Sequence, residues 1–504
     1  MGASAVRLVV AQIEPGKPVE VLEEASRGVL LGRDTFSHGV IDSGTIEAAL
    51  KALTGFRHIM DGYGVRVYRA VATSAVREAR NADTFLDRIR IRTGITFEII
   101  NEAEENRLSY LAVRDQLKGH VVLRATDTLL VEVGGGSAGL TLLNRGEPRQ
   151  SGVYALGAIR MRESLGLSRH AHEQRLRLLR RYIANVVEEI RGEVPLRRAT
   201  HVIAIGGDMR FAASEIVGVD AVDAAAPEVS REAFLAFCDD VEGDDEERLV
   251  ERYRLAAADA ETFVPAMLVY RHILRETRAR RLVVPEASLR AGLLIDLASG
   301  GEPAGEDFEH QVLASAEALG RRYRFDAAHG RATLHLSTRL FDELTREHGL
   351  GQRERLLMQV SALLHDIGIF VSLRAHHKHS QYLLSASQIF GLSNDDLAIV
   401  SNITRYHRRG TPQKTHLPYI ALDRDDRVVV NKLAALVRLA NALDAEHLQK
   451  VKDVRVYQED DVWVVELEGQ GDLTMERMAA SARADMFSEV FGKAIAIRGG
   501  GVQP

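Results

Sequence analysis

The chain of 504 residues contains a single cysteine, Cys238, which excludes an intramolecular disulfide. Such scarcity is typical of proteins in a reducing compartment, and we expect a cytoplasmic protein. No apolar run is long enough to span a bilayer, so the sequence predicts no transmembrane helix. The first residues also lack a charged segment followed by an apolar one, and we expect no signal peptide.

An excess of positive charge is also absent, since the formal net charge is −6 at pH 7. A polyanionic partner would therefore need a local basic surface rather than a globally basic protein. Arginines do cluster at 175–181 and 278–281, but both clusters have the pattern of solvated helix faces. We expect neither DNA nor a membrane surface as a partner.

The stretch 129–143 has the sequence LLVEVGGGSAGLTLL, two apolar β-forming runs around a glycine-rich loop. It predicts a β-hairpin whose tip carries almost no side chains. Backbone N–H groups at such a tip can approach an anion closely, and phosphate is the usual anion. Glu132, just before the loop, is placed to hold a divalent metal or a water beside that phosphate. An ordinary glycine-rich turn is the alternative interpretation.

Strands alternate with helical segments in the first part of the chain, among them a strand at 65–72 and a helix at 102–116, which predicts an α/β fold. The acidic run at 239–247 has the pattern of a solvated loop. The order of loop, strand and turn at 134–148 resembles the order at 1–16, and we interpret this as an internal duplication. A Gly/Pro/Glu linker at 300–305 precedes a mainly α region that ends in an alternating strand pair at 454–468. The expected division is a first lobe, a second lobe, a helical domain and a small α+β segment, at 1–125, 126–300, 306–450 and 451–504.

Several motifs follow one another along the first two lobes. They are ATSAVREARN at 72–81, EENRL at 104–108, EVGGGS at 132–137, LGAIR at 156–160 and IGGDMR at 205–210. In combination they resemble the exopolyphosphatase/guanosine pentaphosphate phosphatase family of the actin-like ATPase superfamily. The resemblance continues through SLRAGLL and LLHDIG into the second half. It implies duplicated RNase H-like lobes followed by a helical HD-type domain.

The resemblance implies a phosphoanhydride hydrolase that releases terminal orthophosphate from inorganic polyphosphate, from guanosine pentaphosphate (pppGpp), or from both. It also implies Mg²⁺ in the front cleft between the two lobes, and a homodimer. Glu105 would be the general base or water orienter, and Glu132 would be the second catalytic residue. The phosphate-binding residues would be Arg77, Gly134, Gly135, Gly136, Ser137, Gly206 and Gly207.

The sequence departs from the family pattern at several positions. Glu132 stands where the family has Asp, and Gly139 stands where it has an acidic residue. The loop at 1–5 lacks the family's aspartate, and the first lobe lacks the strand that should precede that loop. We therefore expect either a slow, degenerate site or a natural chain that begins upstream with an apolar strand ending in Asp. A catalytically degenerate regulator that binds polyphosphate or an alarmone is one alternative function.

The helical region carries a second set of chemically reactive residues. The HD superfamily uses such a set to bind one divalent metal, and here it would be His329, His365, Asp366 and Asp444. Histidines at 376, 377, 379 and 407 could extend this set to two metals, which would support phosphoester hydrolysis. One alternative is an HD-type metal phosphohydrolase with the front lobes as sensor. The other is a helical scaffold whose histidines bind no metal.

Overall fold

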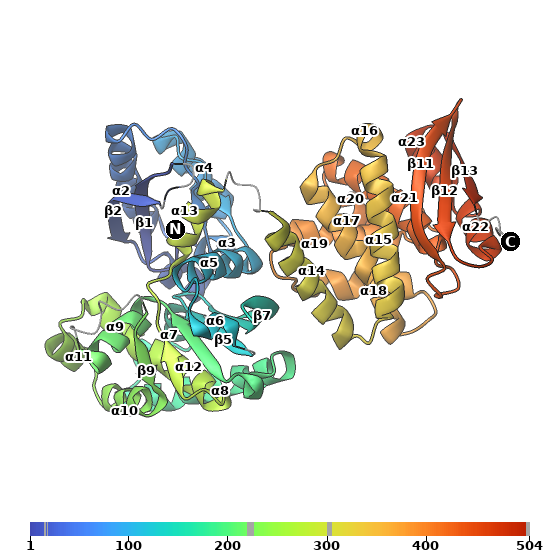
Figure 1. Ribbon diagram of the computed structural model, residues 1–504. Helices are drawn as coiled ribbons and strands as arrows, with labels where there is room; N and C mark the ends of the chain where they lie inside the picture. The colour runs from blue at the N-terminus through green and yellow to red at the C-terminus, as the bar shows by residue number, and fades with distance from the viewer. Residues whose placement is uncertain (15–16, 18, 126, 219–225, 300–304, 500–504) are drawn as a thin grey trace. The chain divides into compact units, whose positions relative to one another are not determined.

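The computed structural model describes residues 1–14, 17, 19–125, 127–218, 226–299 and 305–499 (Figure 1). The chain divides into two compact units, Met1–Phe308 and Glu309–Pro504. The linker expected at 300–305 lies outside the described residues except at its last position, and the division between the units falls just after it.

A six-stranded sheet forms the second lobe of the first unit, in the order β7-β6-β5-β8-β10-β9 (Figure 1). β5 and β8 are parallel neighbours and are buried along almost their whole length. They are continuous apolar runs because the centre of a parallel sheet is covered on both faces. The strands are β5 (Thr128–Val133), β6 (Ala138–Asn144), β7 (Glu147–Tyr154), β8 (His201–Ile205), β9 (Glu228–Ser230) and β10 (Arg281–Val283).

The acidic segment 239–247, expected to be a solvated loop, instead ends one helix and begins the next. Arg252 accounts for much of this difference, because it pairs with Asp240 at 2.5 Å and with Asp244 at 3.0 Å and so offsets their repulsion. The helices of this lobe are α7 (Ala158–Ser164), α8 (His172–Glu193), α9 (Gly207–Val217), α10 (Arg231–Glu242), α11 (Glu246–Tyr253) and α12 (Ala257–Glu276).

The first lobe contains two small sheets. β1 (Ala5–Gln12) pairs antiparallel with β2 (Glu20–Gly28), and β3 (Val71–Ala72) pairs parallel with β4 (Glu98–Ile99). The β1–β2 hairpin has the same antiparallel pairing as β6 and β7, which the expected duplication requires. The helices of this lobe are α1 (Leu31–His38), α2 (Ser43–Gly62), α3 (Ser74–Arg77), α4 (Ala82–Thr93), α5 (Glu102–Gln116) and α6 (Val121–Arg124).

The strand expected at 65–72 was predicted too long, since only its last two residues pair with β4. Val67 is 76% exposed and Tyr68 is 38% exposed, so this apolar run does not face a core. An apolar pattern overestimated the strand because strand formation depends on a neighbouring strand as well as on local residue type.

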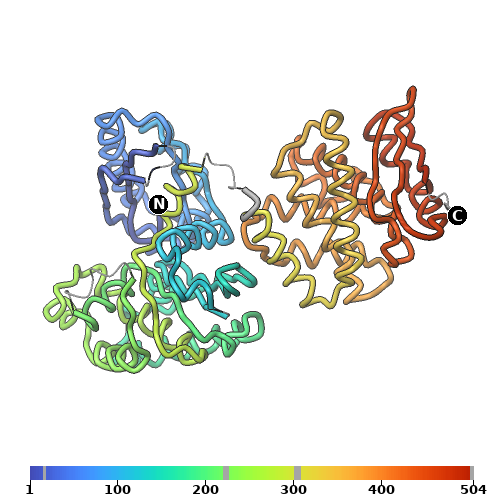
Figure 2. Tube along the Cα trace, in the orientation of Figure 1, coloured from blue at the N-terminus to red at the C-terminus, as the bar shows by residue number. Residues whose placement is uncertain are grey.

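α13 (Leu289–Ala298) follows the last strand of the second lobe but packs against α5 of the first (Figure 2). Gly292 makes the close approach possible, since a Cβ there would lie 2.0 Å from a backbone oxygen of α5. The buried carboxylate of Asp296 accepts hydrogen bonds from Arg107 Nη2 at 2.8 Å and from Arg69 Nη1 at 2.6 Å. This charged network holds α5 against α13.

The second unit is mainly helical and ends in a three-stranded sheet with two short helices. β12 (Val462–Gly469) lies between antiparallel β11 (Val451–Glu459) and parallel β13 (Ala494–Gly499). The longer helices are α14 (Gly305–Arg322), α15 (Ala327–Glu343), α17 (Gln352–Leu364), α18 (His376–Ser385), α19 (Asn394–Arg405) and α21 (Arg424–Ala442). The shorter ones are α16 (Thr345–His348), η4 (Ile367–Phe370), α20 (Leu417–Ile420), α22 (Thr474–Ser481) and α23 (Asp485–Phe491).

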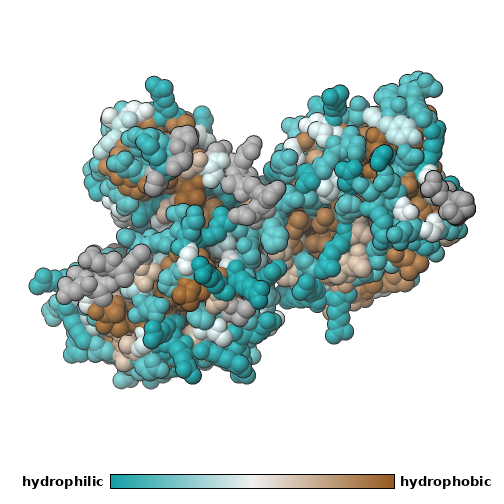
Figure 3. Space-filling view, viewed as in Figure 1, coloured by the Kyte–Doolittle hydropathy of each residue, from teal (hydrophilic) through white to brown (hydrophobic). Residues whose placement is uncertain are grey.

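Among the described residues, no helix is long and apolar enough to cross a bilayer. α8 illustrates the usual pattern, because its buried residues Leu179, Ile183, Val187 and Ile190 form one stripe on an otherwise polar helix. The face of the molecule in Figure 3 is mostly hydrophilic, with hydrophobic residues in scattered patches.

Candidate functional site

The tip of the β5–β6 hairpin, residues 134–137, lines a cleft in the first unit. The N–H groups of Ala158 and Arg160 donate to two carbonyls of this tip, each at 3.0 Å. No described residue accepts a hydrogen bond from the N–H groups of Gly135 and Gly136. The first turn of α7 therefore fixes the loop through its carbonyls and leaves N–H donors for an anion.

Gly136 in this loop and Gly157, which packs against it, have no room for a side chain. A Cβ on Gly136 would lie 2.0 Å from Ser74 Oγ, and a Cβ on Gly157 would lie 2.1 Å from the carbonyl carbon of Gly136. Glycine is required at both positions because backbone meets backbone or a short side chain directly there.

A second glycine turn, Gly206-Gly207, connects β8 to α9 and lines the same cleft. Gly206 has a φ of 131°, a conformation that side chains disfavour. Gly207 begins α9, so the positive end of this helix lies at the cleft and favours a bound anion. Tyr270 Oη donates to the carbonyl of Ile205 and accepts from Val133 N–H at 3.0 Å, which ties the ends of β8 and β5 together.

Besides Asp259, three carboxylates line this cleft. Glu132, near the end of β5, accepts a hydrogen bond from Ser109 Oγ at 2.5 Å. Glu105, in the first turn of α5, accepts from Arg77 Nη1 at 2.8 Å. Asp208 lies in the first turn of α9. Two of the three were expected from the sequence, and Asp208 was not.

Burial raises the pKa of all three carboxylates. It raises the pKa of Glu105 to about 7, with Arg77 opposing the change and Glu132 adding to it. It raises the pKa of Asp208 to about 6, and the charge of Asp259 adds to the effect. Burial also raises the pKa of Glu132. A carboxylate with a pKa near 7 is suited to accept a proton from water at neutral pH.

Arg77, which the resemblance placed against a phosphate, contacts two acidic side chains and a backbone carbonyl. Its Nη1 donates to Glu105 and, at 2.6 Å, to the carbonyl of Ile100, while its Nη2 pairs with Glu102 at 2.7 Å. Arg77 is absent from the described residues that line the cleft. The guanidinium therefore holds the Glu105 carboxylate, and a contact of Arg77 with phosphate stays a prediction.

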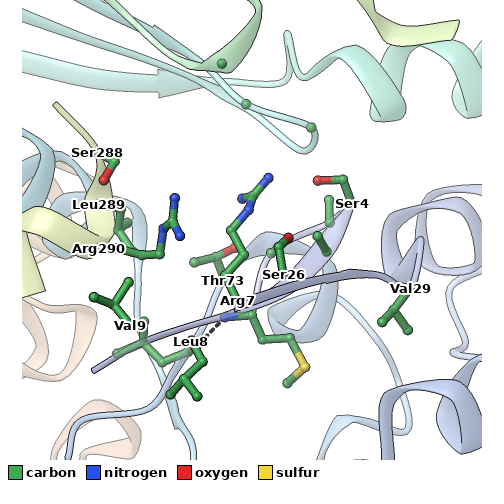
Figure 4. Close-up of a pocket in the computed structure, with 18 of the residues that line it drawn as sticks. Ser4, Arg7, Leu8, Val9, Ser26, Val29, Thr73, Ser288, Leu289 and Arg290 are labelled. Atoms are coloured by element: carbon green, nitrogen blue, oxygen red, sulfur yellow. Dashed lines mark hydrogen bonds between the residues drawn. The ribbon is translucent and has the colours of Figure 1, made fainter. Parts of the chain in front are cut away.

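Sequence reasoning missed Arg7, Arg210 and Arg290, which line the cleft together with Arg69, the partner of Asp296. In Figure 4, Arg7 and Arg290 extend to the same side of β1 as Ser4 and Ser288. Burial and then the charges of Arg290 and Arg210 lower the pKa of Arg7, which places the three cations close enough to repel one another. Neighbouring cations in a cleft attract an anion of several charges.

The signals for these arginines were present in the sequence. Arg7 interrupts the apolar run of β1, whereas Arg210 and Arg290 belong to the motifs IGGDMR and SLRAGLL. The cleft that they line has a volume of about 1250 Å³. Pockets for small ligands usually measure about 300–1,000 Å³, so this cleft can admit a nucleotide or several linked phosphates.

The front cleft fits a magnesium ion that is bound together with a phosphate. Mg²⁺ is usually held by one or two carboxylates, phosphate oxygens and water. Glu132 and Asp208 supply two carboxylates, and their raised pKa values reflect buried negative charge that a cation would offset. In the described part of the chain, the cleft carboxylates do not form a close group that could cage an ion by itself.

In the second unit, the structure brings the four expected metal ligands together. His329, in the first turn of α15, has Nδ1 2.8 Å from Asp444 Oδ2 and Nε2 3.2 Å from His365 Nε2. His365 and Asp366 directly follow α17, and His365 Nε2 lies 3.6 Å from Asp366 Oδ2. His329, His365 and Asp444 are each 1% exposed. Whether this cluster binds a metal stays a prediction.

Two of the four additional histidines join this cluster. Nε2 of His376 and Nε2 of His407 lie 3.1 and 3.3 Å from Asp366 Oδ1. Neither His377 nor His379 belongs to a group of possible ligands among the described residues. No motif pointed to His447, which stacks on His329 with ring centroids 3.7 Å apart.

Comparison with known families matches both units. The profile of the Ppx/GppA phosphatase family matches residues 9–300, and the profile of Ppx/GppA phosphatase domain III matches residues 313–479. The helical unit, expected to be an HD-type domain, is therefore matched as domain III, and the comparisons do not support the HD-type assignment.

Two curated relatives are guanosine-5'-triphosphate,3'-diphosphate pyrophosphatases. The one from Vibrio vulnificus is 20% identical over 81% of this chain and 80% of its own, and the one from Vibrio campbellii is 22% identical over 83% and 81%. Among solved structures, a Ppx/GppA family member from Aquifex aeolicus has a TM-score of 0.50 and an exopolyphosphatase from Cytophaga hutchinsonii one of 0.53. Each is 22% identical and covers 60% of this chain and 96% of its own, a likeness that shows the fold.

Proposed function

The chain belongs to the Ppx/GppA phosphatase family and is a hydrolase, and we propose that it removes the terminal phosphate of pppGpp or inorganic polyphosphate in the cleft of its first unit. The observation that supports this most is Glu105. Its buried carboxylate, with a pKa of about 7, lines the same cleft as two glycine turns and three arginines. pppGpp and polyphosphate both present a terminal phosphoanhydride, so one arrangement of groups serves either.

In the proposed reaction, a water oxygen attacks the terminal phosphorus and the bond from that phosphorus to the bridging oxygen breaks. Glu105 accepts a proton from the water, and the products are orthophosphate and a chain one phosphate shorter. The free N–H groups of the 134–137 loop and the N-terminus of α9 bind phosphate oxygens. Arg7, Arg210 and Arg290 offset their negative charge.

Mg²⁺ belongs to this proposal as a cofactor of the front cleft. Glu132 and Asp208 would hold it, and the ion would neutralise phosphate oxygens during transfer. We assign Arg77 a positioning role, because its guanidinium holds the Glu105 carboxylate in place. In this proposal the 134–137 loop and the arginines 7, 210 and 290 bind the phosphate.

Orthophosphate release from pppGpp and from polyphosphate tests this function in the full chain. Glu105→Gln should reduce turnover by roughly two to four orders of magnitude with little change in substrate affinity. Glu102→Gln is the matched control, because Glu102 pairs with the same arginine but does not line the cleft. Unchanged turnover in Glu105→Gln would remove this residue from the mechanism.

A second candidate function is metal-dependent phosphoester hydrolysis of HD type by the second unit. The observation that favours it is the convergence of His329, His365, Asp366 and Asp444. Phosphate release that survives Glu105→Gln but is lost in Asp366→Asn would support this function over the first. Binding of polyphosphate or pppGpp with no release in the unaltered protein would instead indicate a regulator.

A further inference from the structure

Gly139 lies directly opposite Glu132 in the β5–β6 hairpin. Residues that face each other across two antiparallel strands project their side chains to the same face of the sheet, with Cβ atoms about 4.5–5.5 Å apart. Because residue 139 is a glycine, β6 places no side chain beside Glu132. Glu132 lines the front cleft, so the group that fills this place bears on the site.

The amide of Asn106 fills the place beside Glu132. A Cβ on Gly139 would lie 2.3 Å from Asn106 Oδ1, compared with 3.4 Å from the amide carbon and 3.9 Å from the amide nitrogen. An asparagine or aspartate holds its own side-chain oxygen about 2.4 Å from its Cβ. The amide oxygen of Asn106 therefore stands where a short side chain at position 139 could place an oxygen.

Helix α5, which carries Asn106, also contacts the Glu132 carboxylate directly. Ser109, three residues after Asn106, donates from Oγ to Glu132 Oε2 at 2.5 Å. Side chains three residues apart lie on one face of a helix, so the Asn106 amide and the Ser109 hydroxyl lie on the same side of α5. Glu105, the residue before Asn106, lines the cleft. Asn106 thus lies between two elements of the proposed site.

The hydrogen-bonding capacity of the Asn106 amide is not used up within the protein. Asn106 is 6% exposed, and its buried Nδ2 has no hydrogen-bond partner among the described residues. A buried polar group without a partner costs stability unless an ion, a water or a ligand interacts with it. Alanine would fit a helix at this position without that cost. A buried asparagine here therefore points to a ligand.

A cation beside Glu132 is the ligand that this arrangement favours. In the described part of the chain, the cleft carboxylates do not form a close group that could cage an ion. An ion held there therefore needs oxygens from other groups. A side-chain amide supplies such an oxygen, since Mg²⁺ in protein kinases is held by an aspartate and an asparagine.

We propose that Asn106 is a further ligand residue of the front site, and that its amide oxygen holds the divalent cation together with Glu132. This rests on the proposed function, because the cation is the Mg²⁺ of that reaction. The described residues that line the cleft include Glu105 and Glu132 but not Asn106, so the amide reaches the ion from the protein side. Water or phosphate oxygens around the ion would accept hydrogen bonds from Nδ2.

Direct binding of Mn²⁺ tests this assignment without turnover. Mn²⁺ favours oxygen ligands as Mg²⁺ does, and electron paramagnetic resonance distinguishes its free and bound forms. The full chain is titrated with Mn²⁺ in the presence of orthophosphate, and the ion that is lost in Glu132→Gln defines the front site. We expect Asn106→Ala to raise the dissociation constant of this ion at least about tenfold, since even residues that only orient a metal ligand contribute about 10–100-fold.

Three further variants separate a ligand from a residue that only packs. Asn106→Leu fills a similar volume without an oxygen and should lose Mn²⁺ affinity as Asn106→Ala does. Asn106→Asp keeps the oxygen and should bind Mn²⁺ at least as tightly as the unaltered protein. Asn144→Ala, at the other end of β6, is the matched control and should leave binding unchanged. Far-ultraviolet circular dichroism verifies the folding of each variant.

Moving the amide from α5 to β6 is the sharpest test of the geometry. Asn106→Ala combined with Gly139→Asn supplies the oxygen from the strand, and we expect it to recover most of the lost Mn²⁺ affinity. Gly139→Ala alone should weaken binding, because its Cβ would displace the Asn106 amide. Unchanged affinity in Asn106→Ala or in Asn106→Leu, or a double variant no better than Asn106→Ala, would overturn the assignment.

Phosphate release at varied Mg²⁺ separates this inference from the proposed function. In Asn106→Ala, the Mg²⁺ concentration for half-maximal release from pppGpp or polyphosphate should rise by about the factor measured with Mn²⁺. Release with the same Mg²⁺ dependence in Asn106→Ala and the unaltered protein would overturn the role of Asn106 and leave the function. Mn²⁺ bound through Asn106 in an unaltered protein that releases no phosphate would overturn the function and support the ligand assignment.

Discussion

Glu105 is the residue whose protonation decides the proposed reaction. Burial raises the pKa of its carboxyl to about 7, and only the deprotonated form can accept a proton from water. We therefore expect kcat/KM for orthophosphate release to rise with pH through about 7 and to level off above it. A pH–rate profile of the full chain measures this rise in kcat/KM. A kcat/KM that stays constant from below to above pH 7 would contradict the role of Glu105.

The same shift in pKa makes a prediction about stability. The folded pKa of Glu105, about 7, lies above its ordinary value of 4.5, so between these values the folded state binds more protons than the unfolded state. The contribution of this residue to the free energy of unfolding is therefore fully present below its ordinary pKa and is lost as pH rises through the folded one. Denaturant unfolding at both ends of this pH window measures the effect. As pH rises, the free energy of unfolding should fall less in Glu105→Gln than in the unaltered protein.

Arg77 acts through Glu105, and its removal should show in the pH profile. Its positive charge opposes the upward shift of the Glu105 pKa, so Arg77→Gln should move the rise in kcat/KM to higher pH. The loss of turnover should be large at neutral pH and partly recovered at alkaline pH. A uniform loss at all pH values, with a raised KM, would instead support the direct phosphate contact that the sequence predicted.

The helix α5 shows how far the sequence could specify an element of this site. It spans Glu102–Gln116, the range predicted from the sequence, because its signals are local. Asn101 caps the N-terminus by accepting from Glu104 N–H at 2.9 Å, and the acidic first turn complements the helix dipole. Local chemistry therefore fixed the element that carries Glu105.

The surroundings of that helix depend on contacts between distant parts of the chain, which the sequence could not supply. Arg7 and Arg290 come from opposite ends of the first unit and meet at one cleft only because α13 returns to α5. The glutamates that bind Arg77 lie on a different element from Arg77 itself, so its role as a partner of Glu105 was hidden as well. Residue type was predictable here, and the partner of each residue was not.

The two glycine turns are the elements most sensitive to substitution. Gly206→Ala would force a side chain into a φ of 131° and place its Cβ 3.3 Å from the carbonyl oxygen of Val133. We expect a loss of about 1–3 kcal/mol in unfolding free energy and a loss of phosphate release. Gly55→Ala is the control, because Gly55 lies inside α2, does not line the cleft and has no atom within 4 Å of the added Cβ.

The outcome for the control has the opposite sign. Alanine in a helix interior is more favourable than glycine by roughly 0.5–1 kcal/mol, so Gly55→Ala should stabilise the protein with its activity unchanged. Thermal unfolding and orthophosphate release of both variants provide the measurement. Full activity in Gly206→Ala would show that the β8–α9 turn is not part of the phosphate site.

At the scale of the whole molecule, we propose two separate sites for phosphate chemistry. The first unit presents backbone donors, arginines and carboxylates, which suit Mg²⁺ and a phosphoanhydride. The second presents imidazoles around a shared carboxylate, which suit a softer metal. The first set follows from motifs that the family resemblance supplied. The second became visible only when helices distant in sequence placed their histidines together.

This separation predicts that the two units respond to different ligands. Each unit is compact and has buried apolar residues of its own, so we expect two unfolding transitions on heating. A ligand stabilises only the unit that binds it. Zn²⁺ should raise the midpoint of one transition, and polyphosphate with Mg²⁺ should raise the midpoint of the other. Differential scanning calorimetry measures both.

Variants assign each transition to its unit. Asp366→Asn should abolish the response to Zn²⁺ and leave the response to polyphosphate, whereas Arg7→Gln should do the reverse. Arg7 is suited to this test because its cation lies beside two others, so its removal lowers the positive charge of the cleft without breaking an ion pair among the described residues. A single transition that both ligands shift, in both variants, would show that the units unfold as one and that the two sites are coupled through the fold.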